Sequence, residues 1–150
     1  MDYSEFKNIH AQYNEVSEAR LVFARRIESH PLIEWMFGLA RIDASLVLTV
    51  EWGGVTMRAV PRLVKTGPRN GEWLCTEYVF RVAEGGYEAG SEVARFYLSL
   101  FGSLFKKVAP NGDLTGLVFD GKNPQAASLL YRAVITALME SDLLKASPLG

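Results

Sequence analysis

Two neighbouring glycines, Gly53 and Gly54, separate two runs of residues in which apolar and polar side chains alternate. The runs cover residues 45–52 and 55–64. A period of two is typical of strands with one buried face, and a two-residue glycine turn supplies the positive φ angles of a tight hairpin. The pattern therefore predicts a β-hairpin. Pro61 predicts that the second strand is an edge or is bulged, because proline cannot donate a ladder hydrogen bond.

A long helix is predicted before the hairpin, over residues 3–30. Seven residues follow one another at spacings of three and four, as on one helix face: Phe6, Ile9, Tyr13, Val16, Arg20, Phe23 and Ile27. Arg20 interrupts this otherwise apolar stripe, which suggests that the helix is not wholly inside the protein. Pro31 disfavours helical geometry in the residue before it, so we expect the helix to end there and a short apolar helix to follow over residues 32–37.

The second half of the chain is interpreted with the same two periods. Alternation predicts a third strand over residues 73–82 and a short fourth strand over residues 114–119. Between them, the apolar residues of segment 91–108 recur at helical spacing, which predicts a helix. The last predicted helix covers residues 124–145 and carries a single charged residue, Arg132, along most of its length. A helix of that composition needs cover on more than one side.

These elements predict one α+β domain over residues 1–150, a length within the usual range for a single domain. The expected order is α-(α)-β-β-β-α-β-α, with a small antiparallel sheet of three to four strands. Long N-terminal and C-terminal helices are expected to pack on one face of that sheet. In order of elements and in size the chain resembles the small dimeric chaperones of type III secretion. That resemblance implies a cytoplasmic protein that forms dimers.

Few residues of the chain can carry catalysis or bind a metal. It has one cysteine and two histidines, and it lacks the GxxxxGK[ST], HExxH, CxxC and GxSxG motifs. We therefore expect no catalytic residue, no metal and no cofactor. The net charge of −1 argues against a generally basic nucleic-acid binder. No apolar run is long enough for a membrane span and no secretory signal is recognisable, so a cytoplasmic protein without a membrane partner is expected.

The distribution of charge along the chain suggests one surface. Four basic residues and no acidic residue lie between residues 52 and 71, namely Arg58, Arg62, Lys65 and Arg69. Arg58 and Arg62 are four apart on a predicted strand and so share a face. A local field of one sign can attract an acidic protein partner or a nucleic-acid backbone. The same charges also suit a solvated edge strand that must not pair with other chains.

Apolar residues suggest a second surface. Trp35, Met36 and Phe37, together with the last helix, offer more apolar area than one side of a small sheet absorbs. The sequence therefore favours a non-enzymatic, adaptor-like or chaperone-like interaction protein, expected to be a homodimer. It would bind a partner through an apolar helix face and the basic hairpin.

Two alternatives stay open. The first is a small-ligand-binding domain or enzyme, with a pocket between sheet and helices lined by Tyr78, Phe80, Phe96, Tyr97 and Tyr131. The second is nucleic-acid binding through the basic hairpin.

Overall fold

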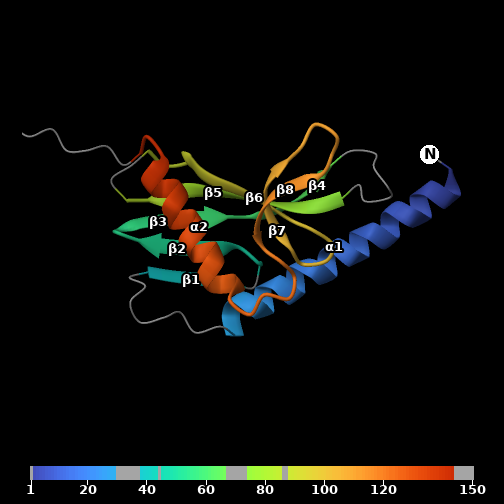
Figure 1. Cartoon of the computed structure of the whole chain (residues 1–150), viewed down its shortest axis with the longest axis horizontal. Helices are drawn as coiled ribbons and strands as arrows, with labels where there is room; N and C mark the ends of the chain where they lie inside the picture. Colours follow the sequence, from blue (N-terminus) through green and yellow to red (C-terminus); the bar gives the residue numbers. More distant parts are fainter. Residues whose placement is uncertain (1, 30–37, 44, 67–73, 86–87, 144–150) are drawn as a thin grey trace, which may run out of the picture.

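The computed structural model describes residues 2–29, 38–43, 45–66, 74–85 and 88–143, and shows two helices and one large antiparallel sheet (Figure 1). The chain is therefore α+β, as predicted. In chain order the elements are α1 (Tyr3–Ser29), β1 (Gly38–Ile42), β2 (Leu48–Trp52), β3 (Val55–Ala59), β4 (Pro61–Lys65), β5 (Leu74–Glu84), β6 (Glu92–Leu98), β7 (Leu104–Val108), β8 (Leu114–Phe119) and α2 (Ala126–Glu140).

The sheet is an antiparallel meander with the strand order β1-β2-β3-β5-β6-β7-β8. Strands β3 and β4 occupy one position of this order, because both pair with the long strand β5, at its opposite halves. The predicted hairpin is confirmed: Trp52 pairs with Val55 around Gly53 and Gly54, whose φ angles of 59° and 79° suit a tight turn. The second predicted strand divides just before Pro61, which begins β4, and β4 pairs with β5 alone.

Both helices contribute side chains to one core on the same face of the sheet. Phe23 of α1 lies against the rings of Tyr78 and Phe119, at centroid distances of 5.4 and 5.9 Å. Helix α2 contributes Leu130 and Val134 to the same core and contacts strands at both ends of the strand order, β1 and β8. The sheet therefore curves around α2. We call the opposite side of the sheet the outer face.

Arg26 fixes the C-terminal half of α1 to two loops. Its guanidinium donates to the carbonyl oxygens of Gly102, at 3.4 Å, and of Asn123. Its Cζ atom lies 5.2 Å from the centroid of the Phe119 ring. Burial lowers the pKa of this guanidinium, which still remains charged at neutral pH because arginine titrates so far above it. The contacts of Arg26 hold this half of the helix against the β6–β7 turn and the segment before α2.

The helix predicted over residues 91–108 is wrong, because this segment forms strands β6 and β7. Ala94, Phe96 and Leu98 alternate into the core, and β6 pairs with β5 along most of its length. The chain turns between the two strands at Gly102, whose φ is +82°. The predicted count of three to four strands is also wrong, since eight strands of the described residues join the sheet. Strands β6 and β7 replace the predicted helix, the second predicted strand divides into β3 and β4, and β1 had no predicted counterpart.

The corrected order of elements also removes the basis of the resemblance to type III secretion chaperones. That resemblance depended on a helix between the third and fourth predicted strands, and strands stand there instead. The short helix predicted over residues 32–37 lies outside the described part of the chain. Within the described ranges, neither helix has the length and apolar character needed to cross a membrane.

Candidate interaction surfaces

The structure places the predicted basic residues at the outer face and along its edge. Arg58 pairs with Arg81 across β3 and β5, and Arg62 pairs with Glu77 across β4 and β5. Because Arg81 and Glu77 are four residues apart on β5, both arginines project from the same side of the sheet. Lys65 is exposed at the end of β4, and Arg69 lies outside the described residues.

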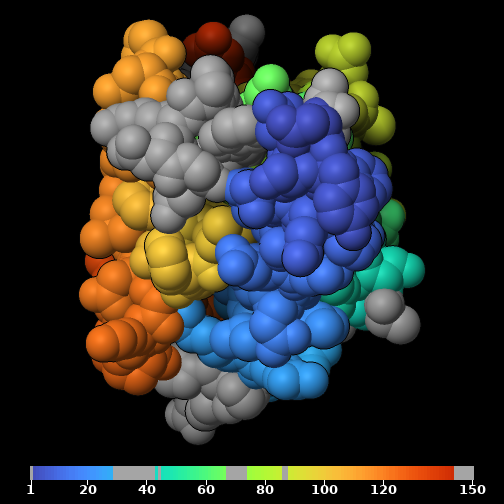
Figure 2. All heavy atoms as spheres, turned by 90° about the vertical axis from the view of Figure 1, so that its right-hand side faces the viewer, coloured from blue at the N-terminus to red at the C-terminus, as the bar shows by residue number. Residues whose placement is uncertain are grey.

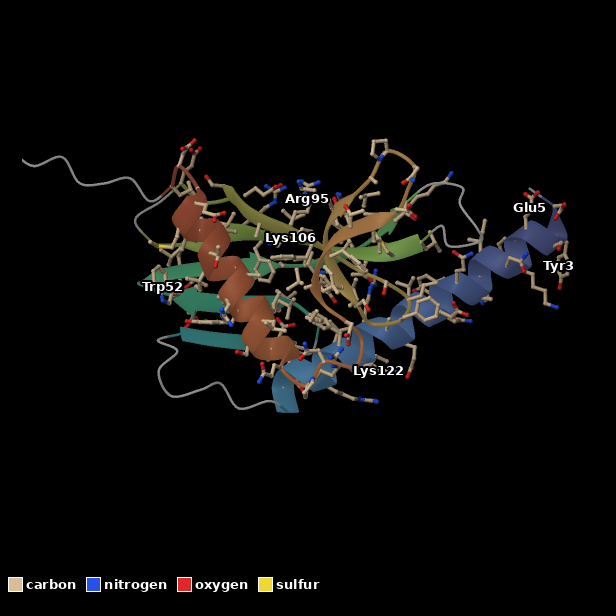
Figure 3. All side chains as sticks on the ribbon, viewed as in Figure 1. Tyr3, Glu5, Trp52, Arg95, Lys106 and Lys122 are labelled. Carbon is tan, nitrogen blue, oxygen red and sulfur yellow. The ribbon has the colours of Figure 1, made fainter. Side chains whose placement is uncertain are left out.

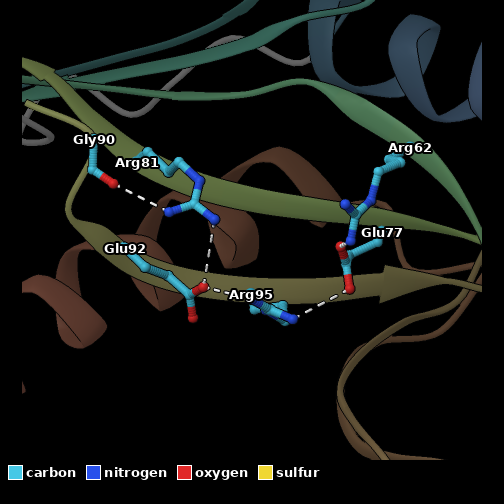
Figure 4. A network of polar contacts seen from close by, with 6 residues as sticks. All are labelled: Arg62, Glu77, Arg81, Gly90, Glu92 and Arg95. Atoms are coloured by element: carbon cyan, nitrogen blue, oxygen red, sulfur yellow. Dashed lines mark hydrogen bonds and ion pairs between the residues drawn. The ribbon is translucent and has the colours of Figure 1, made fainter.

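A buried carboxylate organises part of the outer face (Figure 4). Glu77 is only 4% exposed, although it lies on the side of the sheet away from the helices. Arg62 Nη2 donates to its Oε1 at 2.5 Å, and Arg95 Nη1 donates to its Oε2 at 3.4 Å. Glu77 thus has an arginine at each oxygen, which compensates for removing its charge from water.

A second carboxylate extends the network to the neighbouring strand. Glu92 Oε1 accepts a hydrogen bond from Arg95 Nη2 at 2.6 Å and lies 4.0 Å from Arg81 Nη2. Arg81 also donates to the carbonyl oxygen of Gly90 at 3.1 Å (Figure 4). Hydrogen bonds to Glu92 and Tyr97 raise the pKa of Arg95, so its guanidinium stays charged.

Arginines gather on the outer face around these two carboxylates. We call Arg58, Arg62, Arg81 and Arg95 the arginine cluster. Three of its members form ion pairs with Glu77 or Glu92. Two further glutamates share this face, because Glu51 pairs in register with Thr56 and the Thr56 hydroxyl donates to Glu84. Arg58 has no ion pair with any residue in the described ranges. Sequence reasoning found Arg58 and Arg62 but missed Arg81 and Arg95, which reach the cluster only through strand register.

The second candidate surface is the N-terminal half of α1. Val16, Phe23 and Ile27, in the C-terminal half of its apolar stripe, are buried. In the N-terminal half, Phe6 and Tyr13 of the stripe are 58% and 47% exposed, and the neighbouring Tyr3 is 80% exposed. We call Tyr3, Phe6 and Tyr13 the exposed stripe. No strand in the described part of the sheet covers it.

The figures show that this half of the helix extends beyond the sheet. Helix α1 runs past the ends of the strands in Figure 1, and Tyr3 and Glu5 lie at its far end in Figure 3. Figure 2 looks at that end and shows the first residues of the helix, in dark blue, on the surface with no other coloured segment over them. The predicted apolar segment Trp35, Met36 and Phe37 lies outside the described residues.

The groups considered for catalysis lie in unreactive surroundings. Cys75 is buried, and burial, with a smaller contribution from Glu77, raises the pKa of its thiol to about 12. A thiol with that pKa is protonated at neutral pH and is a poor nucleophile. His10 is exposed and stacks on Phe6 at 6.3 Å between ring centroids. The described ranges contain no group of three or more side chains arranged to hold a metal ion.

The pocket predicted between sheet and helices is filled by side chains. The hydrophobic core includes Tyr78, Phe80, Phe96 and Tyr131. Tyr97 instead pairs with Glu77 in the β5–β6 register and lies on the outer face. A shallow depression of about 280 Å³ lies elsewhere, where β5 begins and β6 ends. Its lining mixes apolar side chains such as Phe101 and Phe105 with Ser99 and Asp113, and the described residues that line it include no arginine, lysine or histidine.

Comparison with known proteins adds no identity to these surfaces. No protein-family model matches the chain, and neither a curated protein nor a solved structure matches it at a significant level.

Proposed function

We propose that this chain is a non-enzymatic interaction protein, of the adaptor or accessory-chaperone kind, that binds a protein partner through the N-terminal half of α1. One observation carries the proposal. The stripe that is buried at Val16 and Phe23 continues, along the same helix, into a half where Phe6 and Tyr13 face solvent. In the part of the chain that the structure describes, a single amphipathic helix therefore buries its apolar stripe in the core along only half of its length.

The exposed stripe is large enough to contribute substantially to binding. Phenylalanine and tyrosine bury about 150–250 Å² each when fully covered. With the exposed fractions of Tyr3, Phe6 and Tyr13, the three side chains present roughly 300–400 Å². At about 25 cal/mol per Å², covering that area contributes roughly 7–10 kcal/mol before the cost of association. An apolar patch of this size on a monomer is often functional.

Helix energetics point to the same partner-binding role. Residues 3–15 are exposed apart from Ile9 and Gln12, which are half-buried. A helix of about 12–15 residues is only marginally stable in water without tertiary contacts. A groove that receives the stripe would stabilise this half of α1 and bury its aromatic rings, as in the helix-in-groove mode of recognition.

The partner is a protein of the same compartment, for which we expect the cytoplasm, and a second copy of the chain is one candidate. Nucleic acid is less favoured because the arginine cluster lacks an exposed stacking platform. Among the described residues, register places the aromatic ring of Tyr97 beside these arginines, and this side chain is partly buried and hydrogen-bonded to Arg95.

A pair of matched double variants tests the proposal. Tagged wild-type chain and the Phe6→Ser/Tyr13→Ser variant are recovered from extracts of the cells that make the protein. Co-purifying proteins are quantified by mass spectrometry, and light scattering gives the mass of each purified species. The control is Asn8→Ser/Glu15→Ser, which changes two exposed residues on the other side of the same helical segment.

We expect wild type and control to retain a protein partner, or to form a dimer, and the Phe6→Ser/Tyr13→Ser variant to lose it at least tenfold. A wild-type chain that is monomeric, and whose set of co-purifying proteins is unchanged in the variant, would show that the exposed stripe binds nothing.

A further inference from the structure

We infer that the arginine cluster of the outer face docks an acidic segment of a protein partner. The inference rests on the proposed function only in taking the partner to be a protein, since the surface is a different one. It follows from two properties of the cluster: an unfavourable cross-strand pair at Arg58, and the fixed positions of the other guanidinium groups.

Arg58 gives the strongest indication that the cluster is used. It lies directly opposite Arg81 in the β3–β5 register. Like charges in directly opposite positions of a sheet are destabilising. Glu92 lies near Arg81, but Arg58 has no acidic partner in the part of the chain that the structure describes. A carboxylate from outside would relieve this pair and give Arg58 the counter-charge that it lacks.

The remaining guanidinium groups are held in place yet accessible. Glu77 fixes Arg62 and Arg95, and Glu92 fixes Arg95 again (Figure 4). The side chains of Arg62 and Arg81 are nevertheless 69% and 52% exposed. Arginine offers five donors in a rigid fork, and fixing it in advance lowers the entropy lost on binding a carboxylate.

An acidic peptide fits this face better than a nucleic-acid backbone. A backbone presents closely and regularly spaced phosphates, and the glutamates between the arginines would repel many of them. A short extended segment with a carboxylate at every second residue places its charges on one side, about 6.6 Å apart. Two or three such carboxylates would meet Arg58 and the exposed guanidinium groups of Arg62 and Arg81.

Fluorescence anisotropy with defined probes tests the inference. The main probe is a labelled 12-residue peptide of alternating Glu and Ser, and the others are the same peptide with Gln for Glu and a single-stranded 12-mer of thymidylate. Arg58→Glu is compared with Arg132→Glu, which makes the same charge change at an exposed site on α2, on the helix side of the sheet.

We expect the Glu peptide to bind, and the Gln peptide and the oligonucleotide to bind at least tenfold more weakly. Arg58→Glu should weaken binding of the Glu peptide at least tenfold, and Arg132→Glu less than twofold. The inference is overturned if the oligonucleotide binds as tightly as the Glu peptide, if Gln and Glu peptides bind alike, if no peptide binds, or if the two variants weaken binding equally.

Two further controls separate a loss of peptide binding from a loss of folding, and one surface from the other. Arg58→Glu places a carboxylate opposite Arg81, so its thermal midpoint should be unchanged or raised. If that variant fails to fold, Arg58→Gln replaces it, with the same direction of effect on peptide binding. The Phe6→Ser/Tyr13→Ser variant should bind the Glu peptide as wild type does. Loss of peptide binding in that variant would refute a separate surface, whereas failure of the peptide to bind at all would leave the proposed function standing.

Discussion

Replacing Phe23 by alanine tests the division of α1 into a buried and an exposed half. Phe23 is 1% exposed, and its ring packs between those of Tyr78 and Phe119. Truncating a phenylalanine in such a core costs about 3–5 kcal/mol, through lost burial and the cavity that remains. For a chain of this length each kcal/mol lowers the thermal midpoint by about 2–4 °C, so Phe23→Ala should lower it by roughly 6–20 °C.

Phe6→Ala is the matched control, because it makes the same chemical change on the same stripe at a side chain that is 58% exposed. Less than half of the Phe6 side chain is buried, so truncation removes little buried apolar area. Alanine is also the better helix former, so the free energy of unfolding should change by no more than about 1 kcal/mol. Urea denaturation followed by circular dichroism at 222 nm measures both free energies of unfolding. Equal losses for the two variants would refute the reasoning, since the stripe would then be buried along its whole length.

Three other perturbations have definite expected outcomes. Glu77→Gln should lower the free energy of unfolding by about 1–3 kcal/mol in urea titrations, and Glu92→Gln by less than about 1, because only the first carboxylate is buried. Because burial raises the pKa of Cys75 to about 12, the folded state keeps a proton that the unfolded state releases near pH 9. Its contribution to stability is thus complete below pH 9 and is lost between pH 9 and 12, so Cys75→Ala should flatten the alkaline fall in thermal midpoint. Gly121→Ala should destabilise the chain by about 1–3 kcal/mol, because a Cβ there would lie 2.2 Å from the carbonyl oxygen of Phe101; a midpoint equal to wild type would contradict that contact.

Elements determined by local chemistry could be predicted from the sequence. The hairpin follows from Gly53 and Gly54, whose positive φ angles few other residues adopt without cost. Helix α1 follows from a stripe spaced by three and four residues, and Arg20 in that stripe donates from Nε to Thr76 Oγ1 at 2.8 Å. In both cases the element is determined by residues close to one another in the sequence, so the sequence pattern is enough to predict it.

The segment over residues 91–108 could not be assigned in this way, because its apolar residues satisfy both periods. Phe96 and Leu98 alternate with Tyr97, as a strand requires, while the wider set of apolar residues also recurs at helical spacing. Pairing with β5 decides the outcome, and this pairing is not encoded within the segment. Gly102 was the available signal, since glycine inside a helix costs about 1 kcal/mol and here it has a positive φ.

The arginine cluster was only half predictable for a related reason. Along the chain, the basic run that contains Arg58 and Arg62 is followed by a run rich in glutamate, and the two look like separate surfaces. The antiparallel register interleaves them, so that Glu77 meets Arg62 and Arg81 meets Arg58. A count of charges along the sequence therefore does not give the electrostatic field of a sheet, because strand pairing brings residues from distant parts of the chain together.

At both proposed surfaces, a different residue would make the folded chain more stable. Serine or lysine at Phe6 would leave less apolar surface in water, and glutamate at Arg58 would pair with Arg81 across the strands. Elsewhere the described chain both follows and departs from the local rules: the buried Glu77 is paired at both oxygens, whereas Arg20 Nη2 and the Tyr131 hydroxyl are buried without a hydrogen-bond partner. Departures at an exposed surface are expected at functional positions, because a bound partner can supply the missing cover or counter-charge. The exposed stripe and the arginine cluster differ in chemistry and in position, so one partner that uses both must present an apolar groove and an acidic segment at separate places.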